Sequence, residues 1–370
     1  MRWPCEDYQQ VLSNLSRLPI ASGKEKPDSE DKNRTIPQET ESDDDESEVD
    51  DFKKAEQRQK IQQEQEALRA KRKIEDLKPR YPYGLIPAKE LAPKRGAGYV
   101  SSCYMDSIFF NSGDAGEQIS AAVGGTIRDP NPCSESIAGE IKPGFKVLDI
   151  GCSYGVQIFP LLHKGAEVVA NDSDAFSLQA LANSLKPEDH KKVQISYGKF
   201  PEETDFPADY FDAVTMYYII HYMKPEEIRS SFKKIYEILK PNGKIYITTL
   251  TPYCGNFEWY TERALLNQKA GHEWPGEIVD RARIWEEITG QPKEKLDDSN
   301  LPNYMHPQFL EILLRETITA GFRGISGLGY CCLDEEAKDE LKELRTKKNI
   351  PLRLLNSYEK CVAYMIAEKK

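Results

Sequence analysis

The feature that most constrains this chain is a glycine turn directly behind a short apolar run, in the stretch KVLDIGCSYGVQ at residues 146–157. The run is apolar apart from Lys146 and Asp149, which is typical of a short buried strand. Gly151 and Gly155 follow, and glycine is favoured where the backbone turns sharply or is approached closely. The stretch therefore predicts a strand that ends in a tight turn, close to a ligand.

Beyond Phe145, strand-like and helix-like segments alternate. The strand-like runs are KVLDI, EVVAND, KVQISYG, FDAVTMYY and KIYITTL, and the helix-like runs between them include GVQIFPLLHKG, AFSLQALANSL and PEEIRSSFKKIYEIL. Such alternation predicts parallel βαβ units with helices on both faces of the sheet. We expect an α/β fold with a Rossmann-like, doubly wound, mostly parallel seven-stranded sheet, whose last strand, YEKCVAYMIAE, is antiparallel at the edge.

The composition divides the chain into three parts. Residues 1–80 are rich in charge and poor in apolar side chains, so we expect a disordered arm with a helical segment. Residues 81–140 contain many Pro and Gly and are interpreted as a segment covering the main domain, with a short helix near 118–123. Residues 141–370 form the predicted domain, with a cap insertion at about 251–304.

The arm allows two interpretations. Its acidic tract, ETESDDDESEVDD, precedes a lysine- and glutamate-rich helical pattern that contains KRK at 71–73. A solvated spacer is favoured, and the alternatives are a docking segment for a protein partner or a nuclear targeting signal.

Charge and cysteine content exclude several classes of protein. The net charge of −11 disfavours nucleic acid as the partner, and the eight cysteines form no CxxC pair. We therefore expect a reducing, intracellular environment, cytoplasmic or nuclear, and no metal site. No run is long and apolar enough to span a bilayer, so no membrane association is expected.

Two nucleotide-binding motifs can be tested against the glycine turn. The dinucleotide motif GxGxxG needs glycine at positions 153 and 156, which hold Ser153 and Val156, so a dehydrogenase is disfavoured. A phosphate-binding P-loop would need a Gly-Lys-Ser/Thr ending, which is absent from the turn.

The stretch VLDIGCSYG resembles the first motif of class I S-adenosylmethionine-dependent methyltransferases. The resemblance continues through VVANDSD, YGKFPEETDF, FDAVTMYYIIHYM and EILKPNGKIYITT, over about residues 140–250. Asp172 closes the second strand 21 positions after Gly151, near the ~20 expected for a carboxylate that binds ribose. The family usually has an acidic residue where Lys199 stands, so an adenine contact by that side chain departs from the pattern.

The resemblance implies S-adenosyl-L-methionine as cofactor and a set of residues around it. Asp149 would accept either from backbone donors or, through water, from the amino group, and Asp172 would bind the ribose hydroxyls. Ser173 and Phe200 would flank the adenine, and Tyr217 ends the fourth strand, where side chains face the cofactor or the substrate. The full set of cofactor-binding candidates is Asp149, Gly151, Cys152, Ser153, Gly155, Asp172, Ser173, Lys199, Phe200 and Tyr217.

The resemblance further implies a methyltransferase that acts by in-line displacement on an acceptor the sequence does not identify, a small molecule or a protein. His221 is the candidate general base because it follows the fourth strand and titrates near neutral pH, and a packing role is the alternative. A regulator or scaffold without catalysis, acting through the arm, is the competing hypothesis.

The insertion after the fifth strand is rich in aromatic residues. Tyr253, Trp259, Tyr260 and Trp274 either form a lid over the substrate or make the core of a small helical cap, and the core is favoured.

Overall fold

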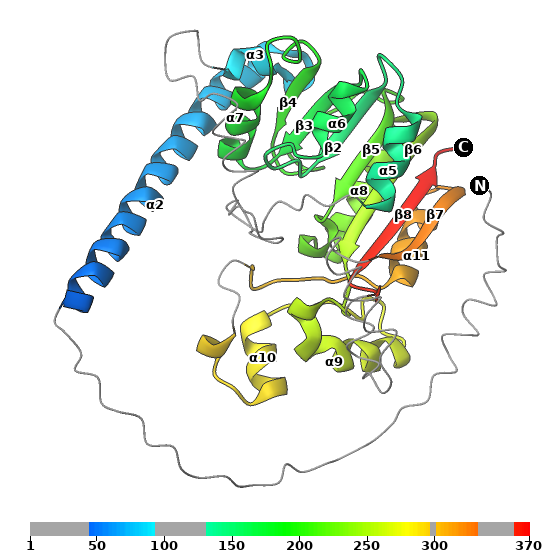
Figure 1. The fold of residues 1–370 in the computed structure, drawn as a ribbon. Coiled ribbons are helices and arrows are strands. Elements are labelled where there is room, and N and C mark those ends of the chain that lie inside the picture. The colour runs from blue at the N-terminus through cyan, green and yellow to red at the C-terminus, as the bar shows by residue number, and fades with distance from the viewer. Residues whose placement is uncertain (1–43, 93–130, 297–300, 332–358) are drawn as a thin grey trace, which may run out of the picture. The chain divides into compact units, whose positions relative to one another are not determined.

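One eight-stranded sheet organises the computed structural model, which describes residues 44–92, 131–296, 301–331 and 359–370 (Figure 1). The strand order is β1-β4-β3-β2-β5-β6-β8-β7. The strands are β1 (Ile86–Pro87), β2 (Lys146–Ile150), β3 (Glu167–Asp172), β4 (Val193–Tyr197), β5 (Phe211–Tyr217), β6 (Leu239–Leu250), β7 (Gly324–Cys331) and β8 (Val362–Glu368).

The sheet is mostly parallel, as the sequence predicts. Strands β4, β3, β2, β5 and β6 are parallel to one another, whereas β1 is antiparallel to β4, and β8 is antiparallel to both β6 and β7. Two details correct the sequence expectation. The final strand, β8, is antiparallel as expected, but it lies inside the sheet because β7 pairs with its outer side. The sheet also has one strand more than expected: β1, which has only two residues and no recognisable sequence pattern, pairs with β4 at the other edge.

Helices cover both faces of the sheet. The apolar cluster on one face includes residues of α5 (Pro132–Glu140), α6 (Ile158–His163) and α7 (Ala175–Ser184), and the cluster on the other face includes residues of α8 (Pro225–Ile238) and α11 (Leu310–Thr319). Helix α8 shows why such segments fold: Ile228, Phe232 and Ile235 recur at helical spacing and are all buried against the sheet.

Polar residues fix where two of these helices begin. The side chain of Asn131 accepts hydrogen bonds from the amides of Cys133 and Ser134 at the start of α5, and Asp174 accepts from Phe176 N and Ser177 N at the start of α7. These caps satisfy amide groups that the first turn of a helix leaves unpaired.

The insertion after β6 forms a separate helical cap, with α9 (Glu258–Lys269) and α10 (Arg281–Thr289) beyond one end of the sheet (Figure 1). Its aromatic residues form its core: Tyr260 is buried, and the Trp259 and Trp285 rings meet edge to face at 5.5 Å. The core interpretation of the cap aromatics therefore holds.

The chain forms two compact units, Met1–Gln57 and Arg58–Lys370. Residues 58–77 of helix α2 (Asp44–Leu77) belong to the second unit, where Ala70 and Ile74 are buried and Lys73 Nζ donates to Leu91 O. The C-terminal part of the segment assigned to the arm thus packs on the domain. Most of the predicted covering segment, including the helix expected near 118–123, lies outside the described residues.

Short elements complete the chain. They are α3 (Ala88–Leu91) and the 3₁₀ turns η1 (Lys78–Arg80), η2 (Pro82–Gly84), η3 (Ile220–Tyr222), η4 (Gly255–Phe257) and η5 (Lys293–Lys295).

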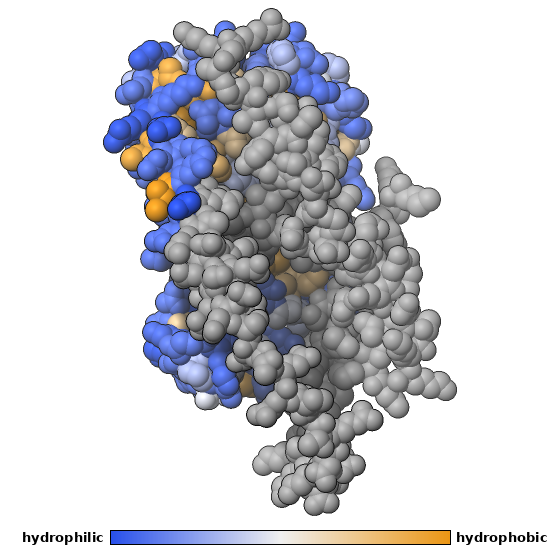
Figure 2. Space-filling view, turned by 60° about the vertical axis from the view of Figure 1, so that its left-hand side comes forward, coloured by the Kyte–Doolittle hydropathy of each residue, from blue (hydrophilic) through white to orange (hydrophobic). Residues whose placement is uncertain are grey.

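The described helices include none that is long and apolar enough to cross a bilayer. On the face drawn in Figure 2 the described residues are mostly hydrophilic, and apolar residues gather only in small separate groups.

Candidate functional site

A cavity of about 390 Å³ opens at the carboxyl ends of the central strands. It lies where the strand order reverses: β3 flanks β2 on one side and β5 on the other, and ligands of open α/β sheets bind at this point. Its volume falls within the range of small-molecule sites, roughly 300 to 1,000 Å³. The lining residues are Asp149, Ile150, Gly151, Cys152, Ser153, Val156, Gln157, Asn171, Asp172, Ser173, Asp174, Gly198, Lys199, Phe200, Tyr217, Tyr218, Ile219, Tyr222, Met223 and Glu227.

The glycine turn forms one wall of the cavity. Gly151 has a φ of +71°, and a Cβ on it would lie 2.4 Å from the side chain of Ile219, which also lines the cavity. Gly155 has a φ of +78°, but its missing Cβ leaves room for Leu181 of α7. Gly151 therefore leaves space beside the cavity, while Gly155 allows the turn to pack closely on a helix.

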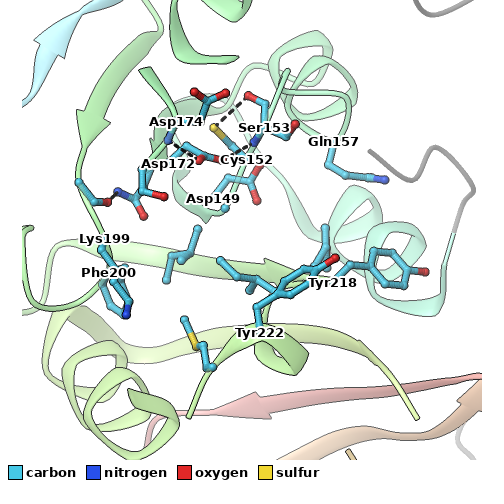
Figure 3. A pocket seen from close by; sticks show the side chains of 18 of the residues that line it. Asp149, Cys152, Ser153, Gln157, Asp172, Asp174, Lys199, Phe200, Tyr218 and Tyr222 are labelled. Atoms are coloured by element: carbon cyan, nitrogen blue, oxygen red, sulfur yellow. Dashed lines mark hydrogen bonds between the residues drawn. The ribbon is translucent and has the colours of Figure 1, made fainter. Parts of the chain in front are cut away.

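Asp172 braces the turn from the end of β3. Its Oδ2 accepts a 2.8 Å hydrogen bond from Ser153 N and its Oδ1 accepts one of 2.8 Å from Asp174 N (Figure 3). Burial raises the pKa of this carboxyl group, and the backbone hydrogen bonds partly oppose that shift. Asp172 also lines the cavity, where its carboxylate oxygen atoms can accept hydrogen bonds from hydroxyl groups of a ligand.

Asp149 is the most deeply buried acid of the site. It is 3% exposed, and its Oδ1 accepts a 2.6 Å hydrogen bond from the hydroxyl of Thr215 on β5. Burial raises its pKa to about 7, while the bond from Thr215 acts in the opposite direction. A buried carboxyl group with such a pKa would be stabilised in its charged form by a cation placed in the cavity.

Lys199 and Glu227 form an ion pair on the rim. Lys199 Nζ bonds to Glu227 Oε1, and the other oxygen of Glu227 accepts a 2.8 Å hydrogen bond from Lys224 N at the start of α8. The nearby ring of Phe200 is buried and packs against Phe206 at 6.2 Å. This end of the cavity combines an apolar ring with a carboxylate that comes from a distant part of the sequence.

Tyrosines form another part of the wall. Figure 3 shows Tyr218 and Tyr222 on the side of the cavity that faces away from Asp172 and Ser153. Tyr218 has a φ of +56°, a conformation that is costly for a bulky side chain and that tends to occur at functional sites.

His221 is not among the residues that line the cavity. It is 1% exposed, its Nδ1 accepts from Leu250 N at 3.4 Å and lies 3.3 Å from Thr249 Oγ1, and burial lowers its pKa to about 3. These contacts agree with the packing alternative, and the adjacent Tyr222 is the residue that lines the cavity.

The sequence-based candidates converge on this one cavity. All the predicted cofactor-binding residues line it except Gly155, which packs beneath the turn. Sequence reasoning missed Glu227, Gln157 and Tyr222. Of these, only Tyr222 could have been indicated by its position, since it lies in η3 shortly after the end of β5, whereas Glu227 reaches the rim through the fold.

Comparison with known proteins agrees with this geometry. Residues 147–243 match the family model of a methyltransferase domain. A mitochondrial ubiquinone biosynthesis O-methyltransferase of Mus musculus is 29% identical over 142 residues, which are 37% of this chain and 38% of that protein. An uncharacterized methyltransferase of Staphylococcus carnosus is 33% identical over 103 residues, 28% of this chain and 45% of that one.

A solved S-adenosylmethionine-dependent methyltransferase from Methanosarcina mazei is 17% identical, with a TM-score of 0.44, and the match covers 65% of this chain and 98% of that one. The two curated relatives, from Mus musculus and Staphylococcus carnosus, are matched over only 38% and 45% of their own length, so this chain spans less than half of each.

The sheet and the family match define a class I, Rossmann-like methyltransferase domain. S-adenosyl-L-methionine is the cofactor of this class, and the cavity suits it, because the acids Asp149 and Asp172 line it together with Gly151.

Proposed function

We propose that this chain is a methyltransferase that transfers the methyl group of S-adenosyl-L-methionine to an acceptor bound at the cavity. The observation that carries the proposal is the convergence of Asp149, the Gly151 turn and Asp172 on one cavity at the sheet's switch point. Asp149 lies on β2, Gly151 in the turn that follows it and Asp172 at the end of β3. Each of them would contact a different part of the cofactor.

The carboxylate of Asp172 would accept hydrogen bonds from the ribose hydroxyls, and Asp149 would bind the ammonium group. Phe200 and Ser173 would flank the adenine, since both line the cavity beyond Asp172. When bound, the cofactor supplies an electrophilic methyl group on a sulfonium.

In the reaction, a lone pair on the acceptor forms the new bond to the methyl carbon as the sulfur–carbon bond breaks. The products are the methylated acceptor and S-adenosylhomocysteine, and an acceptor that carries a proton loses it to solvent or to a nearby base. The protein's part is to align the acceptor, and positioning of this kind can contribute several kcal/mol to lowering the barrier.

Lys199 stands where the family usually has an acidic residue, so a carboxylate at the adenine end of the cavity would have to come from another residue. Glu227 lies on the same rim and is held there by Lys199 and by the Lys224 amide. A carboxylate there can accept a hydrogen bond from the adenine amino group.

For the base, we favour Tyr222 over His221. Tyr222 lines the cavity, whereas His221 is buried with its Nδ1 engaged by Leu250 N. The acceptor itself, a small molecule or a protein, stays open, with nucleic acid disfavoured by the charge of −11.

We also propose an intracellular protein, cytoplasmic or nuclear, whose arm binds a protein partner. The thiols of Cys133 and Cys152 are compatible with a reducing compartment. In α2, Ile61 and Leu68 are about half exposed, which leaves apolar side chains available to a partner.

Calorimetric titration with S-adenosylhomocysteine tests the cofactor site, with Asp172→Asn as the variant. We expect micromolar binding by the wild type and a loss of at least tenfold in the variant, because the amide removes an acceptor for the ribose. Transfer of labelled methyl groups to components of a cell extract then separates an enzyme from a scaffold. Cofactor binding without transfer to any component would favour the non-catalytic alternative.

A further inference from the structure

A short segment, residues 304–308, joins the cap to the carboxyl edge of the sheet. On the cap side, Met305 N donates to Ile278 O at 3.0 Å, and Ile278 N donates to Met305 O at 2.8 Å. On the sheet side, Gln308 N donates to Leu250 O, at the end of β6, at 2.9 Å. Figure 1 shows this part of the chain, in orange, between the end of the sheet and the helices of the cap. The segment therefore lies where the cavity opens.

The cavity wall beside this segment is the stretch of chain that follows β5. Tyr218, Ile219, Tyr222 and Met223 of this stretch line the cavity. Its own hydrogen bonds form one 3₁₀ turn, in which the amides of Tyr222 and Met223 donate to the carbonyl groups of Ile219 and Ile220. Because the hydrogen bonds of such a turn have poor geometry, the turn is weak by itself. The position of this wall therefore depends on contacts from other parts of the chain.

His306 makes two of these contacts. Its backbone N donates to His221 O at 2.7 Å, and its Nδ1 lies 3.1 Å from Met223 O. His221 and Met223 are the neighbours of Tyr222 in the sequence. One residue of the segment thus holds the backbone immediately before and immediately after the Tyr222 side chain.

The ring of His306 is suited to this contact. A carbonyl oxygen only accepts, so the proton of the neutral ring is on Nδ1. Burial lowers the pKa of His306 to about 4, so the ring is neutral near pH 7 and its Nε2 carries no proton. The ring is 1% exposed and packs against Trp274, with the ring centroids 5.1 Å apart. His306 is therefore held as one tautomer whose donor is directed at Met223 O.

Figure 3 shows Tyr222 on the opposite side of the cavity from Asp172. Since Asp172 is the proposed ligand of the ribose, Tyr222 would border the methyl acceptor. We propose that His306 is a positioning residue for methyl transfer, whose two N–H groups hold the backbone around Tyr222, so that the cap sets the geometry of the acceptor side of the cavity. The inference rests on the proposed function and adds a part for the cap in the reaction. A misplacement of about 1 Å can cost roughly a hundredfold in rate.

The test compares two substitutions that replace different nitrogen atoms of the ring. The amide nitrogen of Asn can take the place of Nδ1, whereas that of Gln, one carbon further along the side chain, takes the place of Nε2. Gln also fills more of the buried volume, so a role in packing alone predicts that His306→Gln is the milder change. A role through the hydrogen bond to Met223 O predicts the reverse order.

Transfer of labelled methyl groups from S-adenosylmethionine to components of a cell extract measures the rate with the full chain. His306→Asn should keep at least about a third of the wild-type rate, and His306→Gln should lose about tenfold or more. The affinity for S-adenosylhomocysteine, measured by calorimetry, should stay within about threefold of the wild type in both variants. Hydrogen exchange in residues 218–224 should be faster in His306→Gln than in His306→Asn, which would locate the change in the cavity wall.

His190→Asn is the matched control. The Nε2 atom of His190 lies 3.0 Å from Ala182 O, and His190 does not line the cavity. Asn at this position removes a bond between a histidine and a carbonyl group, because its amide replaces the other ring nitrogen. The variant should keep the wild-type transfer rate and the wild-type affinity for S-adenosylhomocysteine.

The outcomes separate this proposal from the proposed function. A wild type that transfers no methyl group overturns both. A transfer rate in His306→Gln that equals or exceeds the rate in His306→Asn overturns the positioning role and leaves the methyltransferase proposal standing. The same conclusion follows if His306→Gln loses as much affinity for S-adenosylhomocysteine as it loses rate, because His306 would then support the whole cavity.

Discussion

The hydroxyl of Thr215 donates a 2.6 Å hydrogen bond to Asp149 Oδ1, across the parallel pair of β5 and β2. This bond holds the carboxyl group of Asp149 within the sheet, 3% exposed, with its pKa raised to about 7 by burial. The charge of Asp149 near neutral pH should therefore depend on whether the proposed cofactor is bound.

Binding of the cofactor should therefore release a proton. Below pH 7 Asp149 is protonated in the ligand-free protein, and an ammonium group favours its ionised form, so affinity should fall with decreasing pH, by up to about tenfold per unit. Calorimetry at pH 6.5 in two buffers with different ionisation enthalpies measures the released proton directly. Equal heats in the two buffers, with an affinity constant from pH 6 to 8, would contradict this assignment.

The same shift predicts how Asp149 affects stability. Its folded-state pKa of about 7 lies above the unfolded value, so its contribution to the unfolding free energy falls as the pH rises from about 4 to 7. Asp149→Asn should consequently raise the stability of the ligand-free protein at pH 8 while weakening cofactor binding. Chemical unfolding at pH 5 and pH 8 measures the first effect.

Gly151→Ala should damage the cavity as well as the fold. The positive φ costs an alanine about 1 to 2 kcal/mol, and its Cβ would lie 2.4 Å from Ile219 and push that side chain toward the cavity. The matched control is Gly290→Ala at the end of α10, where φ is +65° and no atom lies within 4 Å of the added Cβ. Both variants should lose stability, but only Gly151→Ala should lose affinity for S-adenosylhomocysteine; equal affinities would show that the turn does not shape the site.

Two buried histidines should make the protein sensitive to acid. Burial lowers the pKa of His221 to about 3 and that of His306 to about 4, so the unfolded chain binds more protons than the folded chain below pH 6.5. Stability should fall from pH 6.5 toward pH 4, with a contribution from His221 on the order of 3 kcal/mol at pH 4.

His221→Gln tests this sensitivity, with the exposed His272 as the control position. Its unfolding free energy should change less between pH 7 and pH 5 than that of the wild type, whereas His272→Gln should follow the wild type. A methyl-transfer rate whose pH profile shifts in His221→Gln would restore His221 as the base.

Glu316 should be important for stability through its contacts with two arginines. Its carboxylate is buried and accepts from Arg229 Nε at 3.1 Å and from Arg315 Nε at 2.7 Å, and both guanidinium groups lie over the ring of Trp274. Glu316→Gln should destabilise the protein by roughly 1.5 to 3 kcal/mol because Glu316 loses its charge-assisted hydrogen bonds, while the side chains of Arg229 and Arg315 are 46% and 36% exposed and stay partly solvated.

The exposed pair of Arg283 and Glu287 provides the comparison for Glu316. Arg283→Ala should cost no more than about 0.5 kcal/mol, since exposed pairs contribute little. Similar losses in the two variants, measured by urea unfolding, would show that burial of Glu316 does not matter.

Much of the fold could be predicted because its elements are encoded locally. The apolar runs that became β2 to β6 and the helical pattern of α8 depend only on nearby residues, and the site residues at the glycine turn and at Asp172 follow those strands directly. The two-residue β1 gave no signal, since so short a strand has no periodicity, and its pairing with β4 depends on the rest of the sheet.

The inward position of β8 was also beyond local reasoning. Its sequence is apolar on both faces, which fits a strand at several positions in a sheet, and only its pairing with both β6 and β7 fixed its place. Glu227 gave no functional signal for the same reason, because a helix start looks alike whether or not a ligand lies beside it.

The sequence by itself determined the class of fold, the glycine turn and the acids at the ends of two strands, because hydrophobic periodicity and backbone preference act over a few residues. The tertiary structure decided which side chains face the cavity. It buried His221 away from the cavity, placed Tyr222 in the cavity wall and brought Glu227 to Lys199. It also left the hydroxyl group of Tyr217 without a hydrogen-bond partner, because burial and long-range packing set the surroundings of each polar group.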